Sequence, residues 1–137
     1  MGIFLTELVV RPYPTTAQHD GRNWWLEFQL IYRSDVLGQI VVPKDFLSDF
    51  ASTPAFLWAD IPPWGKWSAA AWLHDWLYAS QPCTREQADN VLLEAMITCG
   101  VDSRRRSLIY AAVRMFGQPS WNQDLEDKIA GRPHIAL

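Results

Sequence analysis

The sequence predicts an α+β fold with a small N-terminal antiparallel sheet, a long irregular loop and a C-terminal layer of three to four helices. Two observations predict it. In the first third of the chain apolar and polar residues alternate, whereas in the last half apolar residues recur at helical spacing between capping signals. A proline-containing stretch over residues 44–66 separates the two halves. The length of 137 residues suits a single domain, residues 1–137, around one core.

The strand prediction rests mainly on LEFQLIYR, residues 26–33. Alternation there places one set of side chains on one face of the strand: Leu26, Phe28, Leu30 and Tyr32. Residues 3–10 alternate in the same way, and QIVVP forms a third short strand that ends at Pro43. HDGRN, with Gly21, is typical of a hairpin turn. Three antiparallel strands are therefore expected.

The helix prediction rests on apolar periodicity and on capping residues. Residues 67–78 are apolar on nearly all sides, which is typical of a buried helix. Thr84 and Gln87 form a capping box for a second helix, which stops at Gly100. A third helix begins at Asp102 or Ser103, ends at Gly117 and presents one apolar face, and SWNQDLEDKIAG is compatible with a further short helix. The apolar face of the third helix comprises Leu108, Ile109, Ala112, Val113 and Phe116.

Charge and composition exclude several classes of function. A net charge of −3 argues against nucleic acid as a partner, because phosphate binding favours a basic face. No apolar run approaches the roughly 20 residues of a membrane span, and MGIFLTELVV has neither the basic segment nor the small-residue cleavage site of a secretory signal. A helix between Cys83 and Cys99 would separate them by roughly 20 Å, so we expect reduced thiols.

A candidate site follows from one histidine in the predicted buried helix. The helical wheel places His74 among Trp67, Ala70 and Tyr78, where an imidazole needs a hydrogen-bond partner. Asp89 lies at the edge of the apolar face of the next helix, and the short SQPCT connection makes the two helices antiparallel neighbours. An aspartate that accepts a hydrogen bond from one ring nitrogen leaves the other nitrogen as a base.

The long loop supplies further polar groups. KDFLSDFASTP interleaves aromatic residues with hydroxyls and carboxylates, and three hydroxyls are expected to line a pocket above the buried helix: Ser48, Ser52 and Thr53. Asp49 together with Asp75 would offer oxygen ligands to a hard cation, Ca²⁺ or another divalent ion. Trp58 and Trp64 in this loop, and Trp121 in the C-terminal half, are candidates for an exposed interface.

Several separate motifs, in order, resemble the DUF1353 family, which is found largely in tailed bacteriophages and prophages. They are VVPKDFLSDFASTPAFLW, AAWLHDWLY, QADNVLLEAM and IYAAVRMFG, and the resemblance extends from about Trp24 to Trp121. It implies a phage origin, with the protein in the virion or in the host cytoplasm, and it brings no established activity.

The helical His-Asp pair is also similar to that of phospholipase A2. There the histidine activates water, the adjacent aspartate binds calcium, and an aspartate on an antiparallel helix orients the histidine. The resemblance gives these roles to His74, Asp75 and Asp89, with Tyr78 in support. This chain departs from that family in two respects: Gly65 stands alone where the family has a glycine-rich calcium loop, and the disulfides of the secreted enzymes are absent.

Two hypotheses of function follow. The first is a small phage-encoded hydrolase of a bacterial envelope component, phospholipid or cell wall, with His74 as the general base. The second is a phage virion, tail or assembly protein without enzymatic activity. In that protein the same His and Asp residues would form a structural hydrogen-bond network, and the tryptophans would contact other virion proteins.

Overall fold

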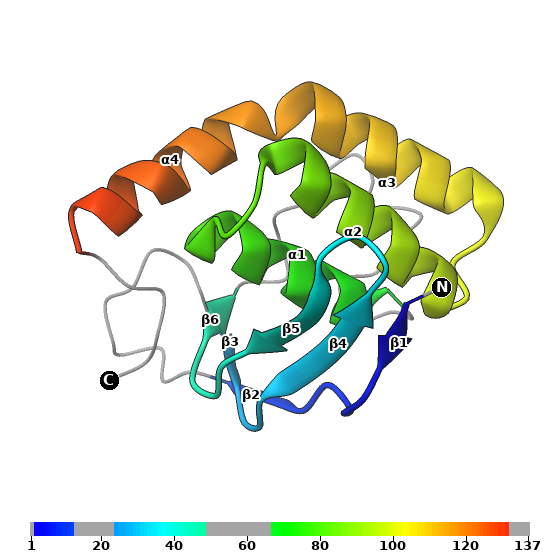
Figure 1. Ribbon diagram of the computed structural model, residues 1–137, viewed down its shortest axis with the longest axis horizontal. Helices are drawn as coiled ribbons and strands as arrows, with labels where there is room; N and C mark the ends of the chain where they lie inside the picture. Colours follow the sequence, from blue (N-terminus) through cyan, green and yellow to red (C-terminus); the bar gives the residue numbers. More distant parts are fainter. Residues whose placement is uncertain (1, 13–23, 49–66, 132–137) are drawn as a thin grey trace.

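The structure is a computed structural model that describes residues 2–12, 24–48 and 67–131 (Figure 1). Within these ranges, two three-stranded antiparallel sheets come first and four helices follow. The first sheet has the order β1 (Ile3–Phe4), β4 (Leu30–Ser34) and β5 (Gly38–Val42). The second has the order β2 (Val10–Pro12), β3 (Trp24–Leu26) and β6 (Leu47–Ser48). The α+β arrangement predicted from the sequence is confirmed. The strands form two sheets, however, where one was expected.

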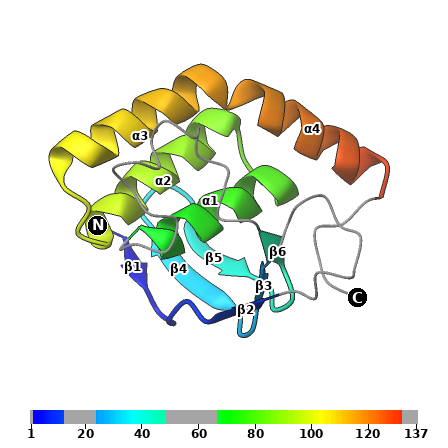
Figure 2. The ribbon, with the colours of Figure 1, turned by 180° about the vertical axis from the view of Figure 1, so that it is seen from behind.

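The helices form two layers above the sheets. They are α1 (Ser68–Ser80), α2 (Arg85–Thr98), α3 (Ser103–Phe116) and α4 (Gln118–Ile129). Figures 1 and 2 show α1 and α2 between the strands and the outer pair of α3 and α4. No described helix has the length and the apolar character that a membrane span requires.

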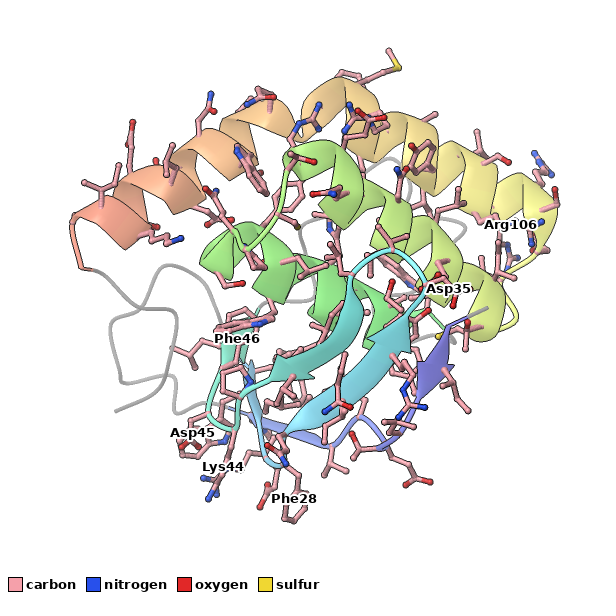
Figure 3. The ribbon with its side chains drawn as sticks, viewed as in Figure 1. Phe28, Asp35, Lys44, Asp45, Phe46 and Arg106 are labelled. Atoms are coloured by element: carbon pink, nitrogen blue, oxygen red, sulfur yellow. The ribbon has the colours of Figure 1, made fainter. Side chains whose placement is uncertain are left out.

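The stretch expected to form one strand over residues 26–33 is split by a bend. β3 ends at Leu26 and belongs to the second sheet, whereas β4 starts at Leu30 and pairs with β5. Three of the four residues predicted to share one face of this strand, Leu26, Leu30 and Tyr32, are fully buried. Phe28, predicted to share that face, is instead 61% exposed and extends away from the body of the molecule (Figure 3). The alternation of side chains holds only within a continuous strand, and the bend interrupts it.

The turn between β4 and β5 is set by local hydrogen bonds. Ser34 Oγ accepts from the backbone N–H groups of Val36 and Leu37, at 2.9 and 3.3 Å. Ser34 pairs with Gly38, whose φ of +76° is in the left-handed region that favours glycine. The hairpin register that results buries Ile40 and Val42 beneath the helices.

The predicted helix signals at α2 and α3 are confirmed. Thr84 Oγ1 accepts from the Gln87 backbone N–H at 3.1 Å, and Gln87 Oε1 accepts from the Thr84 backbone N–H at 3.0 Å. Asp102 caps α3 by accepting from the Arg105 backbone N–H at 2.9 Å. These bonds satisfy donors that a helix start otherwise leaves unpaired.

α1 is the central helix, as predicted. Trp72, Leu73 and Leu77 are fully buried. The apolar face predicted for α3 is only partly correct, since Ile109 and Ala112 are buried but Leu108 and Phe116 are 45% and 55% exposed. An outer-layer helix buries only the narrow stripe that contacts the helix beneath it, so the flanks of the apolar face remain exposed.

The junction of α3 and α4 allows a close approach to the inner helices. Gly117 separates the two helices, and Pro119 lies in the first turn of α4. A Cβ at Gly117 would lie 2.5 Å from Val113 O and 2.7 Å from Tyr78 Oη. Only a residue without a side chain fits between α1 and the end of α3, which brings α3 against the candidate site.

Candidate functional site

Asp89, on α2, is the centre of a buried polar cluster. Its side chain is fully buried and both of its oxygens are occupied. Oδ1 lies 2.7 Å from His74 Nε2 and accepts the Tyr78 hydroxyl at 2.7 Å. Oδ2 accepts from Arg114 Nη1 at 2.6 Å and from Arg85 Nη1 at 3.3 Å. One carboxylate therefore holds groups from α1, α2 and α3.

The helices bring these groups together through simple spacings. His74 and Tyr78 are four residues apart on α1, so they lie on one face with ring centroids 4.3 Å apart. Arg85 and Asp89 are four residues apart on α2. The short connection between α1 and α2 makes the helices antiparallel neighbours, which places that face of α1 against Asp89. The predicted His74–Asp89 hydrogen bond is present.

Arg85 links the cluster to the end of α3. Its Nη1 donates to Val113 O at 3.1 Å and its Nη2 donates to Arg114 O at 3.2 Å. Both carbonyls lie in the last turn of α3, where the helix dipole favours a cation, and Val113 O also accepts the Gly117 backbone N–H at 2.8 Å. Arg85 therefore acts as a clamp between the start of α2 and the end of α3.

Electrostatics keep Asp89 in its charged form. Burial by itself raises the pKa of Asp89, but the hydrogen bond and charge of His74, with the bonds from Tyr78 and Arg114, outweigh it and lower the pKa below its usual value. The bond to Asp89 raises the pKa of Arg114. Burial raises the pKa of Tyr78 well above its usual range, so this hydroxyl remains a donor.

A charged Asp89 assigns the proton on His74. The carboxylate can only accept hydrogen bonds, so in neutral His74 the ring proton lies on Nε2 and the lone pair lies on Nδ1. Among the described residues, no hydrogen bond involves Nδ1. His74 is 8% exposed. This arrangement suits a general base that takes a proton from water at Nδ1.

The structure brings together only part of the predicted site. Asp75 is half-buried on α1. Five predicted residues lie outside the described ranges: Asp49, Ser52, Thr53, Trp58 and Trp64. Ser48 is the last residue of β6, and the structure describes its backbone alone. Among the described residues no three His, Cys, Asp or Glu side chains form a group that could hold a metal ion. A divalent cation at Asp75 and Asp49 stays a prediction.

Trp121, predicted as an interface residue, packs within the fold. It is half-buried, and its ring meets Tyr78 edge-on at a centroid distance of 5.1 Å. Its backbone carbonyl accepts from Gln81 Nε2 at 2.8 Å. Through these contacts α4 covers the Tyr78 side of the cluster.

The two arginines are the site residues that sequence reasoning missed. Arg85 had a local signal, because an Arg four residues before an Asp on one helix forms an ion pair. Arg114 comes from a different helix, 25 positions further along the chain than Asp89, and no local pattern marks it.

The chain belongs to the family described as Protein of unknown function (DUF1353), which it matches over residues 24–113. The matched segment contains His74, Tyr78, Asp89 and Arg85, but ends one residue before Arg114. No curated protein and no solved structure gives a significant match.

Proposed function

We propose that this protein is a phage-encoded hydrolase of a bacterial envelope component, phospholipid or cell wall, in which His74 is the general base. One observation carries the proposal: Asp89 Oδ1 lies 2.7 Å from both His74 Nε2 and the Tyr78 hydroxyl. The pairing holds the imidazole in one orientation and leaves the Nδ1 lone pair for a water molecule.

The proposed chemistry moves one proton twice. Nδ1 of His74 takes a proton from water, and the hydroxide attacks the ester, amide or glycosidic bond of the substrate. The imidazolium that forms is stabilised by the charged Asp89 carboxylate. His74 then returns the proton to the leaving group, which restores the neutral ring.

The choice of substrate rests on the resemblances found in the sequence. A helical histidine, a tyrosine four residues later and an aspartate on the antiparallel helix match the order of the phospholipase A2 residues, and here all three side chains meet at Asp89 Oδ1. The phage origin that the family resemblance implies adds cell wall as a substrate, because a phage must breach both barriers.

Hydrolysis assays with a His74→Gln variant test the proposal. Wild-type protein is incubated with vesicles of phosphatidylethanolamine and phosphatidylglycerol, and separately with purified peptidoglycan. We expect hydrolysis of one of the two, and a loss of about 10²–10⁴-fold in His74→Gln, because the base is removed. Glu126→Gln changes an exposed carboxylate of α4 and serves as the control. Turnover of neither substrate by the wild type, or full turnover by folded His74→Gln, would refute the proposal.

A second candidate is a virion, tail or assembly protein without enzymatic activity. It is favoured by the four donors on Asp89, two of them arginines, which join α1, α2 and α3 as a folding network would. In that case His74→Gln lowers the melting temperature and changes no turnover. Mass spectrometry of purified virions would detect the protein in the assembled particle.

A further inference from the structure

Arg85 and Arg114 both reach Asp89 Oδ2, but their contacts differ. Arg85 has its shorter bonds with the two α3 carbonyls, and its bonds to Asp89 and to the Tyr78 hydroxyl are long, at 3.3 and 3.4 Å. Arg114 donates to Asp89 at 2.6 Å, the shortest contact of the cluster. The Arg85 side chain is 14% exposed and that of Arg114 is 31% exposed. Arg85 is therefore suited to hold helices, and Arg114 is suited to hold the carboxylate.

Arg114 lies at the opposite oxygen of Asp89 from His74. Tyr78 and His74 occupy Oδ1, whereas Arg114 occupies Oδ2. Rotation of the carboxylate about its Cβ–Cγ bond would break these bonds together. A short, charge-assisted bond at Oδ2 thus opposes the movement that would take Oδ1 away from His74.

We propose that Arg114 is a positioning residue for His74, acting through Asp89. By holding Oδ2 it keeps Oδ1 as the acceptor of the His74 Nε2 proton, and so keeps the lone pair on Nδ1. The effect of Arg114 on turnover rests on the proposed hydrolase function. Its effect on the orientation and tautomer of the His74 ring does not depend on that function.

Two substitutions of Arg114 separate positioning from simple packing. Arg114→Gln removes the charge, and because the side chain is partly exposed its loss leaves a solvated gap on the surface. Arg114→Lys keeps one charged donor on a stem of similar length. Arg104→Gln, an exposed arginine on the same helix, is the matched control.

The first measurement is the exchange with solvent of the His74 Nε2 proton, followed by NMR on ¹⁵N-labelled full-length protein. We expect slow exchange in wild type, Arg104→Gln and Arg114→Lys. In Arg114→Gln exchange should be faster by roughly tenfold to a hundredfold, the equivalent of losing a hydrogen bond to a charged group. The ring ¹⁵N shifts should show Nδ1 unprotonated in neutral wild-type His74, and a mixture of tautomers in Arg114→Gln.

The second measurement is turnover on whichever vesicle or peptidoglycan substrate the wild type hydrolyses. Arg114→Gln should lower kcat roughly tenfold or more and leave KM unchanged, because misplacement of the base affects the reacting step. Arg85→Gln should instead lower the melting temperature through its lost α3 contacts.

The outcomes separate the two proposals. If the wild type hydrolyses nothing, the hydrolase proposal fails and the exchange measurement still decides the role of Arg114. If folded Arg114→Gln keeps the wild-type exchange rate and tautomer, the positioning role is overturned. Failure of Arg114→Gln to fold would equally overturn it, since Arg114 would then be a structural clamp like Arg85.

Discussion

Two carboxylates of α2, five residues apart, each accept a buried tyrosine hydroxyl, yet their surroundings differ. Asp89 accepts from Tyr78 at 2.7 Å and also holds His74 and two arginines. Glu94 accepts from Tyr32 at 2.8 Å, and its other oxygen accepts the Asp35 backbone N–H at 3.1 Å. Asp89 joins α2 to other helices, and Glu94 joins it to the hairpin of β4 and β5.

The difference lies in the charge of the donors. The donors to Glu94 are neutral, and Glu94 is only half-buried, so water shares in its solvation. Asp89 is fully buried, and two cations compensate its charge. Neutral donors suffice to attach a helix to a hairpin. A charged cluster with an imidazole can also move a proton, so of the two regions the Asp89 cluster is the one suited to chemistry.

The largest effect should come from truncating each carboxylate. Asp89→Ala removes the shared acceptor of the buried His74 and Tyr78 and of two partly buried arginines, and should lower the free energy of unfolding by about 3–5 kcal/mol. Glu94→Ala removes hydrogen bonds from neutral donors and should cost about 1–2 kcal/mol. Urea unfolding measures both. Equal costs would show that the arginines add nothing to the stability of the Asp89 cluster.

A smaller effect should appear in the pH dependence of stability. The pKa of Asp89 is lowered in the folded protein, so its charged form contributes stability above the pKa of an unfolded aspartate. That contribution is lost as the pH falls through the lower folded pKa. Asp89→Asn should therefore flatten the acid side of a plot of unfolding free energy against pH, whereas Glu126→Gln should leave its shape unchanged. An unchanged acid limb in Asp89→Asn would argue against the charged state of Asp89.

At each of the two carboxylates, removing the tyrosine hydroxyl should have a smaller effect than truncating the carboxylate itself. Tyr78→Phe breaks a bond to a charged, fully buried acceptor and should lower the free energy of unfolding by about 1.5–3 kcal/mol. Tyr32→Phe breaks a bond to Glu94, which is only half-buried, and should lower it by about 0.5–1.5 kcal/mol. Thermal melting of the two variants compares them directly. A larger cost for Tyr32→Phe would reverse the comparison of the two carboxylates.

Much of the site could be predicted from the sequence because its signals are local. His74 lies on a helix that is apolar on nearly every side. A short connection makes the next helix its antiparallel neighbour and places Asp89 opposite His74. The capping box at Thr84 and Gln87 fixes where that helix begins. Spacing along two adjacent helices therefore defines this pairing.

The rest required the tertiary structure. The sequence by itself determined the α+β order of elements, the helix caps, the burial of α1 and the pairing of His74 with Asp89, since each depends on residues within about one turn or one short connection. Only the tertiary structure decided the second sheet, the exposure of Phe28 and the arrival of Arg114 at Asp89. These features depend on how separate elements pack, through a bend at the end of β3 and a close approach at Gly117. Contacts between elements that are distant in the sequence produce no periodic pattern of residues, so the sequence alone does not predict them.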